Sequence, residues 1–290
     1  MKIAICVSGQ PRFANFGAYH QKKWASMLPE GWSVDFYVQS WSQEGVEQHR
    51  ARLFGDYGLA PTRIDPQYMP TEYPTFFHKI RGLSQHYAHF LCQQQIRNID
   101  AYDVIIRTRH DTMLNTDIMD EHVALIQKVY DERTVAGFGF YPDYKDETYV
   151  TTHRDGRSHR GFSKNPTFDD WAIVGHVDRW KSFAKTDNEF HKLLDAEFMN
   201  PDNEHMNATY DLDGLPKRVC IPELVWYQLM GLNKEKDFYV GHGYAYLCRP
   251  TIRDTIKDKP VEAMTPSDVR QALRNGWVNG AAVLRYSILL

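Results

Sequence analysis

Two arginines and a carboxylate alternate at the end of the most strand-like run in the sequence. That run is 103–107 (DVIIR); it ends on Arg107, and Arg109 and Asp111 follow at intervals of two residues. In an extended chain, residues spaced in this way project to one side. Charged groups at the end of a buried strand are costly unless they are paired or bound to a ligand. The cluster suits a diphosphate, with Asp111 on a hydroxyl or a metal, and a structural Arg–Asp network is the alternative.

A second polar cluster follows the first apolar run, 2–7 (KIAICV). Its candidate ligand-binding residues are Ser8, Gly9, Gln10 and Arg12. A turn of small residues lets backbone N–H groups approach an anion, and the N-terminus of the helix expected next favours negative charge. Arg12 would add a bidentate contact to a phosphate. An ordinary tight turn is the alternative.

Carboxylates that could act as a general base occur in two places. Asp169 and Asp170 directly precede the apolar run 171–175, and neighbouring strand residues point to opposite faces, so one of the two is expected to enter a site. A carboxylate near a reacting hydroxyl can remove its proton. Glu223 follows Pro222 at the expected start of a helix. The alternatives are an Asx-turn or cap for the aspartates and a first-turn carboxylate that favours the helix dipole for Glu223.

Basic side chains are concentrated in the segment 152–164 (THRDGRSHRGFSK), which holds four of them against one acid, Asp155. The four are Arg154, Arg157, Arg160 and Lys164. Such a loop could close over a diphosphate, hold an anionic acceptor such as a phosphorylated glycan or DNA, or be an ordinary solvated surface loop.

Apolar runs and helical spacings alternate along the chain and predict the elements that position these clusters. Strands are expected at 2–7, 33–39, 103–107, 134–140, 168–175 and 237–248, and helices at 13–28, 42–60, 76–99, 117–130, 176–198, 222–230 and 266–274. The polar stretches 141–167 and 199–217 lack periodicity and are expected to be irregular, the first as a long loop. This alternation predicts an α/β domain with a mixed sheet flanked by helices, and ligand binding beyond the carboxyl ends of the strands.

The composition limits the possible classes of protein. The 290 residues carry a net charge of −3, and the 42% hydrophobic content predicts a folded chain, taken here as one domain over 1–290. A near-neutral chain is not expected to coat nucleic acid nonspecifically. The four cysteines are widely spaced and form no CxxC pair, which predicts reduced thiols in a cytoplasmic protein. No run of 18 apolar residues occurs, so no transmembrane segment is expected.

Four motifs, in this order, resemble a family of bacterial and viral glycosyltransferase-like proteins with a GT-A-type, nucleotide-sugar-binding fold. The first two are SGQxR after a strand, here residues 8–12, and YDxxIRxRxD, here residues 102–111. The others are an acidic pair before an apolar strand, here 169–175, and a later Pro222-Glu223. The similar blocks span residues 3–230.

The resemblance implies a single GT-A-like (Rossmann-like) domain with a donor site for a nucleoside-diphosphate sugar. The expected donor is a UDP-sugar. Residues 8–12 would contact the nucleotide. Arg107, Arg109 and Asp111 would stand where GT-A enzymes usually carry a metal-binding DxD motif. Because Arg109 replaces its first carboxylate, the arginines could neutralise the diphosphate directly, and a divalent metal (Mn²⁺ or Mg²⁺) at Asp111 is left as an open alternative. Asp170 matches the catalytic carboxylate, with Asp169 and Glu223 as further candidates.

The activity expected on this basis is transfer of a sugar to a hydroxyl acceptor, either a cell-surface glycan or a hydroxymethylated DNA base. Two alternatives remain open. One is a non-catalytic module that binds nucleotide sugars or glycans. The other is a phosphotransferase that uses the same cationic side chains.

Overall fold

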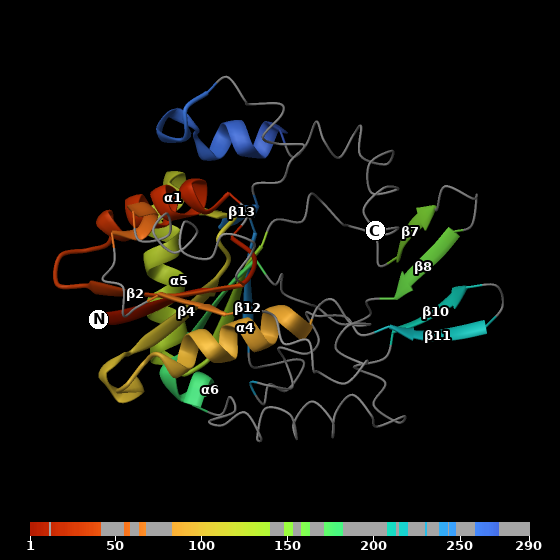
Figure 1. Ribbon diagram of the computed structural model, residues 1–290, viewed down its shortest axis with the longest axis horizontal. Helices are drawn as coiled ribbons and strands as arrows, with labels where there is room; N and C mark the ends of the chain where they lie inside the picture. The colour runs from red at the N-terminus through yellow and green to blue at the C-terminus, as the bar shows by residue number, and fades with distance from the viewer. Residues whose placement is uncertain are drawn as a thin grey trace.

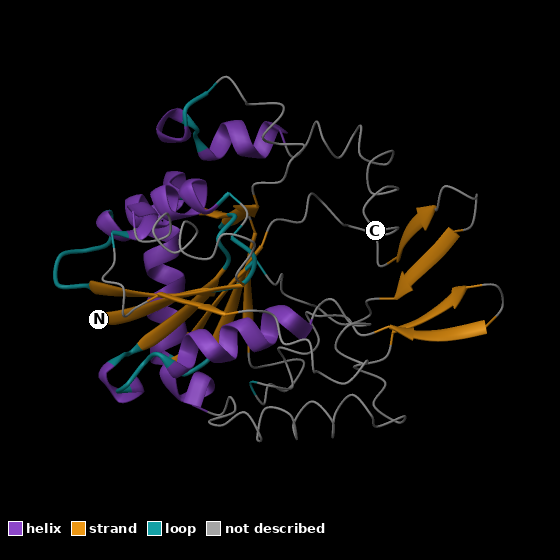
Figure 2. Cartoon of the chain, in the orientation of Figure 1, coloured by secondary structure: helices purple, strands orange, loops and turns teal. Residues whose placement is uncertain are grey.

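The computed structural model describes the chain in fourteen segments. These are residues 1–11, 13–41, 55–58, 64–67, 83–139, 148–152, 158–162, 171–181, 208–212, 215–219, 230, 238–242, 244–247 and 259–272. They form an α/β structure in which helices cover both faces of a mixed sheet (Figure 1, Figure 2), which confirms the predicted fold class. In these segments, no helix combines the length and the apolar character needed to cross a membrane.

The main sheet has seven strands in the order β12-β6-β9-β4-β1-β2-β3. Their bounds are β1 (Lys2–Val7), β2 (Ser33–Trp41), β3 (Ile64–Gln67), β4 (Val104–Thr108), β6 (Val135–Gly139), β9 (Ala172–His176) and β12 (Phe238–His242). Six of them are parallel, whereas β9 lies antiparallel between β4 and β6. Its first residue, Ala172, pairs with the last residue of β4, Thr108. The chain therefore enters β9 at the edge of the sheet where the parallel strands end.

Four helices pack on the two faces of this sheet (Figure 1). Helices α1 (Ala14–Ser26) and α5 (Met119–Asp131) cover one face, and α4 (Leu83–Gln94) and α6 (Val177–Lys181) cover the other. The core under α1 and α5 contains alternate residues of the central strands, such as Ile3 and Ile5 of β1, which are fully buried. Because both faces are covered, these strands are largely apolar along their length instead of alternating with polar residues.

A second apolar cluster joins segments that are far apart in the sequence. Strand β5 (Thr112–Leu114) pairs with β13 (Ala245–Leu247), and the 3₁₀ helix η4 (Val261–Ala263) is followed by helical residues 266–272. The cluster consists of Phe16, Met113, Trp171, Tyr246, Val261, Met264, Val269 and Ala272. It anchors Trp171, the residue that precedes β9, against α1 and β5.

Two stretches that the sequence predicts to be irregular contain β-hairpins. Strands β7 (Thr148–Thr152) and β8 (Ser158–Phe162) pair within the expected 141–167 loop, and β10 (Ala208–Leu212) and β11 (Leu215–Val219) pair in the 199–217 stretch. The absence of alternation concealed them, although β-branched residues in 148–152 and the dipeptide 213–214 (DG) are both hairpin signals. The expected strand 237–248 is also wrong as a single element, since β12 and β13 belong to different sheets.

The remaining short elements are the 3₁₀ helices η2 (Ile99–Ala101) and η3 (Thr116–Ile118). Of the helix expected at 76–99, the structure describes α4, which ends at Gln94; residues 95–99 are described but are not α-helical, and residues 76–82 lie outside the described residues. The helix expected at 176–198 is described as the short α6, with His176 still in β9 and residues 182–198 outside the described residues. The helix expected at 42–60 is described only at 55–58, and of the one expected at 222–230 only residue 230 is described. In Figure 1 the two hairpins lie on the side toward which the parallel strands run.

Candidate functional site

Three segments meet at the carboxyl edge of the parallel strands: the turn after β1, the turn after β4 and the entry into β9. The backbone N–H of Ser8 donates to the carbonyl of Thr108 at 3.0 Å, which joins the first two. The hydroxyl of Thr112 donates to the carbonyl of Trp171 at 3.4 Å, which joins the second and third. The turns after β1 and β4 and the residue before β9 therefore lie together at this edge. The third segment reaches this edge because β9 is antiparallel, so that its start lies where its neighbours end.

The turn after β1 is built around Gly9, whose φ of +113° is rarely adopted by residues with a side chain. Its N–H donates to Oε1 of Gln39 at 3.4 Å, and its carbonyl accepts from the N–H of Trp41 at 3.2 Å. These two bonds attach the turn to the end of β2. Two further donors at this place, Oγ of Ser8 and Nε2 of Gln39, are buried without a hydrogen-bond partner, which normally costs stability.

The turn after β4 carries an ion pair between Arg109 and Asp111. Nε of Arg109 donates to Oδ1 of Asp111 and Nη2 donates to Oδ2, both at 3.0 Å. The side chains are 25% and 9% exposed, so the pair lies at the surface with its carboxylate turned inward. Bidentate pairs of this kind are the strong form of the Arg–carboxylate interaction. The structural alternative, an Arg–Asp network, is therefore present for these two residues.

The expected alternation of residues 107, 109 and 111 along an extended chain is wrong beyond Thr108. The N–H of Thr112 donates to the carbonyl of Arg109 at 3.3 Å, which closes a turn over 109–112. Arg107 is still in β4, is fully buried, and donates from Nη2 to Oε1 of Gln85 on α4 at 3.4 Å. The periodicity of a strand applies only while its ladder continues, and here the ladder ends at Thr108.

Helix α1 holds the 109–112 turn from one side. Nε2 of Gln21 donates to the carbonyls of Arg109 at 2.8 Å and Thr112 at 3.0 Å. One helical turn earlier, Gly17 lies so close to the carbonyl of His110 that a Cβ atom would overlap it. Nε2 of His110 lies 2.9 Å from the carbonyl of Gln39. The turn is therefore fixed by α1 and β2 together.

Burial controls the protonation of two groups beside the site. The pKa of His89 on α4 lies well below its ordinary value, mainly because the ring is buried and secondly because the cationic Arg107 is near. The pKa of Tyr57 is raised, first by burial and then by the neighbouring carboxylates of Asp56 and Asp111. Both side chains are thus neutral over the physiological range, and the described charges beside the turn belong to the arginines and carboxylates.

Several predicted site residues lie outside the described part of the chain. They are Arg12, Arg154, Arg157, Lys164, Asp169, Asp170 and Glu223. Arg160 is placed in β8 opposite Val150, and Gln10 is exposed in the turn after β1. The structure brings together Ser8, Gly9 and the Arg109–Asp111 turn, and it adds Trp171 as the neighbour in sequence of Asp170.

A divalent metal at Asp111, which the sequence leaves as an open alternative, does not fit the arrangement of the carboxylate. Both oxygens accept hydrogen bonds from Arg109, so a divalent cation would have to displace a guanidinium group. The segments that the structure describes also contain no group of three or more His, Cys, Asp or Glu side chains placed to bind a metal. A metal site is therefore not formed at Asp111 in this arrangement.

Four residues that position the site were missed by the sequence analysis: Gly17, Gln21, Gln39 and Thr112. Each acts through close contacts with a segment distant in the sequence, as when Gln21 donates to the carbonyls of residues 109 and 112. Gly17 and Gln21 share a helix face at a spacing of four residues, which was the one available signal. That spacing alone does not reveal which backbone carbonyls lie opposite.

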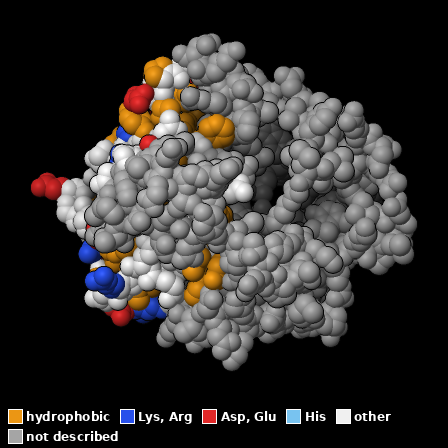
Figure 3. All heavy atoms as spheres, viewed as in Figure 1, with side chains coloured by type: hydrophobic (Ala, Val, Ile, Leu, Met, Phe, Trp, Pro, Cys, Tyr) orange, Lys and Arg blue, Asp and Glu red, His pale blue; other side chains and the backbone are white. Residues whose placement is uncertain are grey.

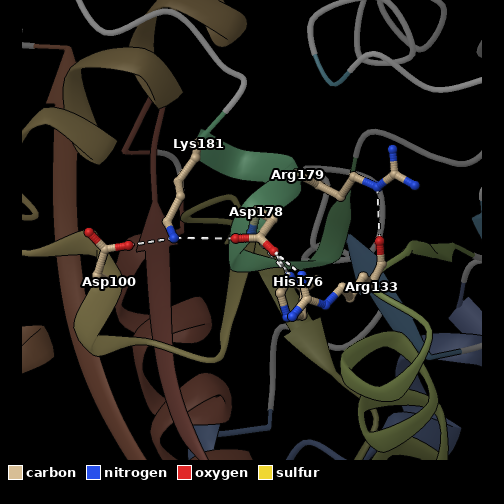
Figure 4. Close-up of polar contacts among 6 residues, drawn as sticks. All are labelled: Asp100, Arg133, His176, Asp178, Arg179 and Lys181. Atoms are coloured by element: carbon tan, nitrogen blue, oxygen red, sulfur yellow. Dashed lines mark hydrogen bonds and ion pairs between the residues drawn. The ribbon is translucent and has the colours of Figure 1, made fainter.

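The opposite edge of the sheet carries a separate network of charges (Figure 4). Asp178 on α6 pairs with Arg133 at 3.1 Å and with Lys181 at 3.2 Å, and Lys181 also contacts Asp100. His176, which pairs with the first residue of β4, accepts from the N–H of Asp178 at 3.1 Å. Exposed pairs of this kind contribute little stability. Charged side chains of the described residues are also scattered at the surface in Figure 3, with no large patch of one sign in that view.

No protein-family model matches the sequence, and no curated protein matches it. Solved structures of glycosyltransferases do show similarity. The galactosyltransferase LgtC, solved with donor and acceptor sugar analogs, is 13% identical over 93% of this chain and 82% of its own, with a TM-score of 0.43. Mouse xyloside xylosyltransferase 1 is 11% identical over 83% of this chain and 84% of its own, with a TM-score of 0.39. A glycosyltransferase involved in the glycosylation of the major capsid of PBCV-1 is 11% identical over 84% of this chain and 83% of its own, with a TM-score of 0.38.

Proposed function

We propose that this protein is a GT-A-like glycosyltransferase that moves a sugar from a nucleoside-diphosphate sugar, with UDP as the nucleotide, to a hydroxyl acceptor. One observation carries the proposal. The Ser8–Gly9 turn, the Arg109–Asp111 turn and the entry into β9 meet at the carboxyl edge of parallel strands, which is where open α/β sheets bind ligands.

The first turn would bind the nucleotide part of the donor. Gly9 lets the backbone pass close to a ligand, and no described atom lies within 4 Å of the position that a Cβ would take there. Ser8 Oγ and Gln39 Nε2 are buried donors without partners, and a ligand acceptor would remove the cost of leaving them unpaired. Gln10 and Arg12 complete this turn in the proposal.

Arg109 would neutralise the diphosphate as it leaves, supported by the buried charge of Arg107. A departing diphosphate gains negative charge in the transition state, and preorganised cations stabilise that charge. In this role Asp111 holds and orients the Arg109 guanidinium instead of binding a metal. No step of the proposed transfer uses a metal at Asp111.

Asp170 would act as the general base, with Asp169 and Glu223 as the other candidate carboxylates. The carboxylate takes the proton of the acceptor hydroxyl, the oxygen forms a bond to the anomeric carbon, and the bond from that carbon to the diphosphate breaks. Support for Asp170 is its position in sequence next to Trp171, whose carbonyl is hydrogen-bonded to the Arg109–Asp111 turn through Thr112.

A glycan hydroxyl is the acceptor in this proposal. The basic segment that includes Arg154, Arg157, Arg160 and Lys164 would form the acceptor or lid region of the same site. A hydroxymethylated DNA base is the other acceptor that the sequence left open, on the ground of the same basic segment. The described residues lend it no support, and DNA is not part of the proposal. The proposed location is the cytoplasm.

The experiment is a UDP-release assay with a panel of UDP-sugars and simple glycan acceptors, combined with titration calorimetry of UDP. The parent protein is expected to bind UDP and to release it from one of the donors. Asp170→Asn is expected to lower kcat at least about 100-fold while UDP affinity stays within twofold, since general-base catalysis contributes about 10²–10⁴-fold. Asp103→Asn, which alters a carboxylate at the opposite edge of the sheet, is the matched control and should retain activity.

A non-catalytic nucleotide-sugar-binding module is the second candidate, and the pairing of Asp111 with Arg109 favours it, because the carboxylate is already occupied. UDP binding without turnover of any donor would support the module and contradict the enzyme. Cleavage of a nucleoside triphosphate without sugar transfer would instead support the phosphotransferase alternative. Absence of UDP binding and of turnover would overturn the donor site itself.

A further inference from the structure

Helix α1 presents a single polar side chain to the backbone of the 109–112 turn. Gln21 is fully buried, and its Nε2 atom donates to the carbonyls of Arg109 and Thr112, which are the two ends of that turn. Both acceptors are carbonyl oxygens, so the amide must direct its NH₂ group toward them. Its Oε1 is buried without a hydrogen-bond partner, so the residue serves here only as a donor.

The same turn is held at two other points. The N–H of Thr112 donates to the carbonyl of Arg109, and Gly17, one helical turn before Gln21, packs directly against the carbonyl of His110. Since the Arg109–Asp111 pair spans this turn, the position of the pair follows from the position of residues 109–112. Gln21 is the one described side chain that bonds to both ends of the turn.

We propose that Gln21 is a positioning residue, which fixes the 109–112 turn so that the Arg109–Asp111 pair is held in the geometry that receives a diphosphate. The inference rests on the proposed function for what the pair binds, but the positioning itself can be measured without a ligand. Burying the amide of Gln21 with its Oε1 atom unpaired costs free energy. The two hydrogen bonds to the turn are the interaction that offsets this cost.

The matched control is Gln93 on α4. It is also a buried glutamine, 7% exposed, and its Nε2 donates to the backbone carbonyl of Trp180 at 2.9 Å, away from the turn. Gln21→Met and Gln93→Met therefore remove the same kind of side chain and hydrogen bonds of the same kind, from a buried amide to backbone carbonyls. A difference between them reports on the turn and not on general stability.

The first measurement is the hydrogen-exchange rate of the backbone amide of Thr112, which is monitored by NMR in the protein without ligand. Gln21→Met is expected to accelerate exchange of this amide at least about tenfold, because opening of the turn frees the bond to Arg109. Gln93→Met is expected to leave it within twofold. If Gln21→Met leaves the protection of Thr112 unchanged, the proposal is overturned.

The second measurement is calorimetric titration with UDP. Gln21→Met should weaken binding about tenfold, whereas Gln93→Met should bind UDP within twofold of the parent protein. Equal affinity in both variants would overturn the role of Gln21 in binding. Should Gln21→Met fold poorly, Gln21→Asn keeps an uncharged amide but is one methylene shorter, so it does not reach both carbonyls and the same losses are expected. A parent protein that does not bind UDP would contradict the proposed function, while the exchange measurement would still decide whether Gln21 positions the turn.

Discussion

Replacing His122 by leucine should reduce the acid sensitivity of this protein. The imidazole is fully buried on α5, and its ring centroid lies 4.7 Å from that of Tyr244, 5.0 Å from Phe138 and 5.6 Å from Trp24. Burial among these rings lowers the pKa of His122 from 6.5 to about 3, with a smaller opposing effect of the backbone at Asn115 and Tyr244. The folded protein therefore keeps this ring neutral at pH values where the unfolded chain protonates it.

The sign and the size of the effect follow from proton linkage. Stability from the neutral ring is fully present above the unfolded pKa of 6.5 and is lost as the pH falls from 6.5 toward 3. At pH 5 the unfolded chain gains about 2 kcal/mol from protonation relative to pH 7.5, at about 1.4 kcal/mol per pKa unit. Because pH 5 lies well above the folded pKa, the folded state stays neutral there. The parent protein should thus lose about 2 kcal/mol through His122 between pH 7.5 and pH 5.

The assay is urea-induced unfolding of the parent protein and His122→Leu, followed by tryptophan fluorescence at pH 7.5 and pH 5. Other titrating groups contribute equally to both proteins, so the difference between their two pH dependences isolates His122. His176→Leu is the control, because burial also lowers the pKa of that histidine but the carboxylate of Asp178 opposes the shift. Its effect on the pH dependence should be smaller than that of His122→Leu.

A His122→Leu variant that loses as much free energy of unfolding between pH 7.5 and pH 5 as the parent protein does would contradict the lowered pKa of His122. That result would mean that His122 binds protons equally in the folded and unfolded states. The packing of its ring against Tyr244, Phe138 and Trp24 would then not exclude the charged form.

Two further substitutions test the packing around the site and the sheet. Gly17→Ala should destabilise the protein, because the new methyl group would overlap the carbonyl of His110. It should also lower the rate of UDP release at least about tenfold, since a misplacement of about 1 Å can cost 10²-fold in rate. An unchanged Tm and an unchanged rate would contradict the close contact. Trp180→Phe should lower the free energy of unfolding by about 1–3 kcal/mol, since it removes the buried donor to the carbonyl of Ile105 at 2.9 Å. Urea titration measures this loss, and a cost near zero would show that the bond is not formed.

The elements that depend on local pattern were predictable from the sequence. The apolar run 2–7 becomes β1, the run 103–107 becomes β4 with a shift of one residue, and helical spacing marks α1 and α5. A strand that is buried on both faces reads as a continuous apolar run, and a helix reads as apolar residues at a period of 3.6. Both signals lie within a short window of sequence. The expectation that polar clusters gather at the carboxyl edge also follows from local information once the strands are parallel.

The hairpins at 148–162 and 208–219 carry local signals in the sequence, but the polar character of the surrounding stretches favoured loops. Their polar sequences lack alternation, and the long polar stretches around them suggested loops. The pairing of Thr152 with Ser158 and of Leu212 with Leu215 nevertheless defines two short connections. A two-residue Asp-Gly connection is a strong hairpin signal even when hydrophobic alternation is weak.

The central strands, the polar turn after β1 and the charged residues after β4 can be read from the sequence alone, because these features depend on neighbouring residues. The antiparallel direction of β9, which brings Trp171 to the end of β4, is set by pairing in the folded chain. The turn at 109–112, in which Arg109 pairs with Asp111, is likewise set in the folded chain, since Gln21 and Gly17 of a distant helix hold that backbone. Strand direction and helix-to-turn contacts are set by pairing between distant segments, and no short window of sequence contains both partners.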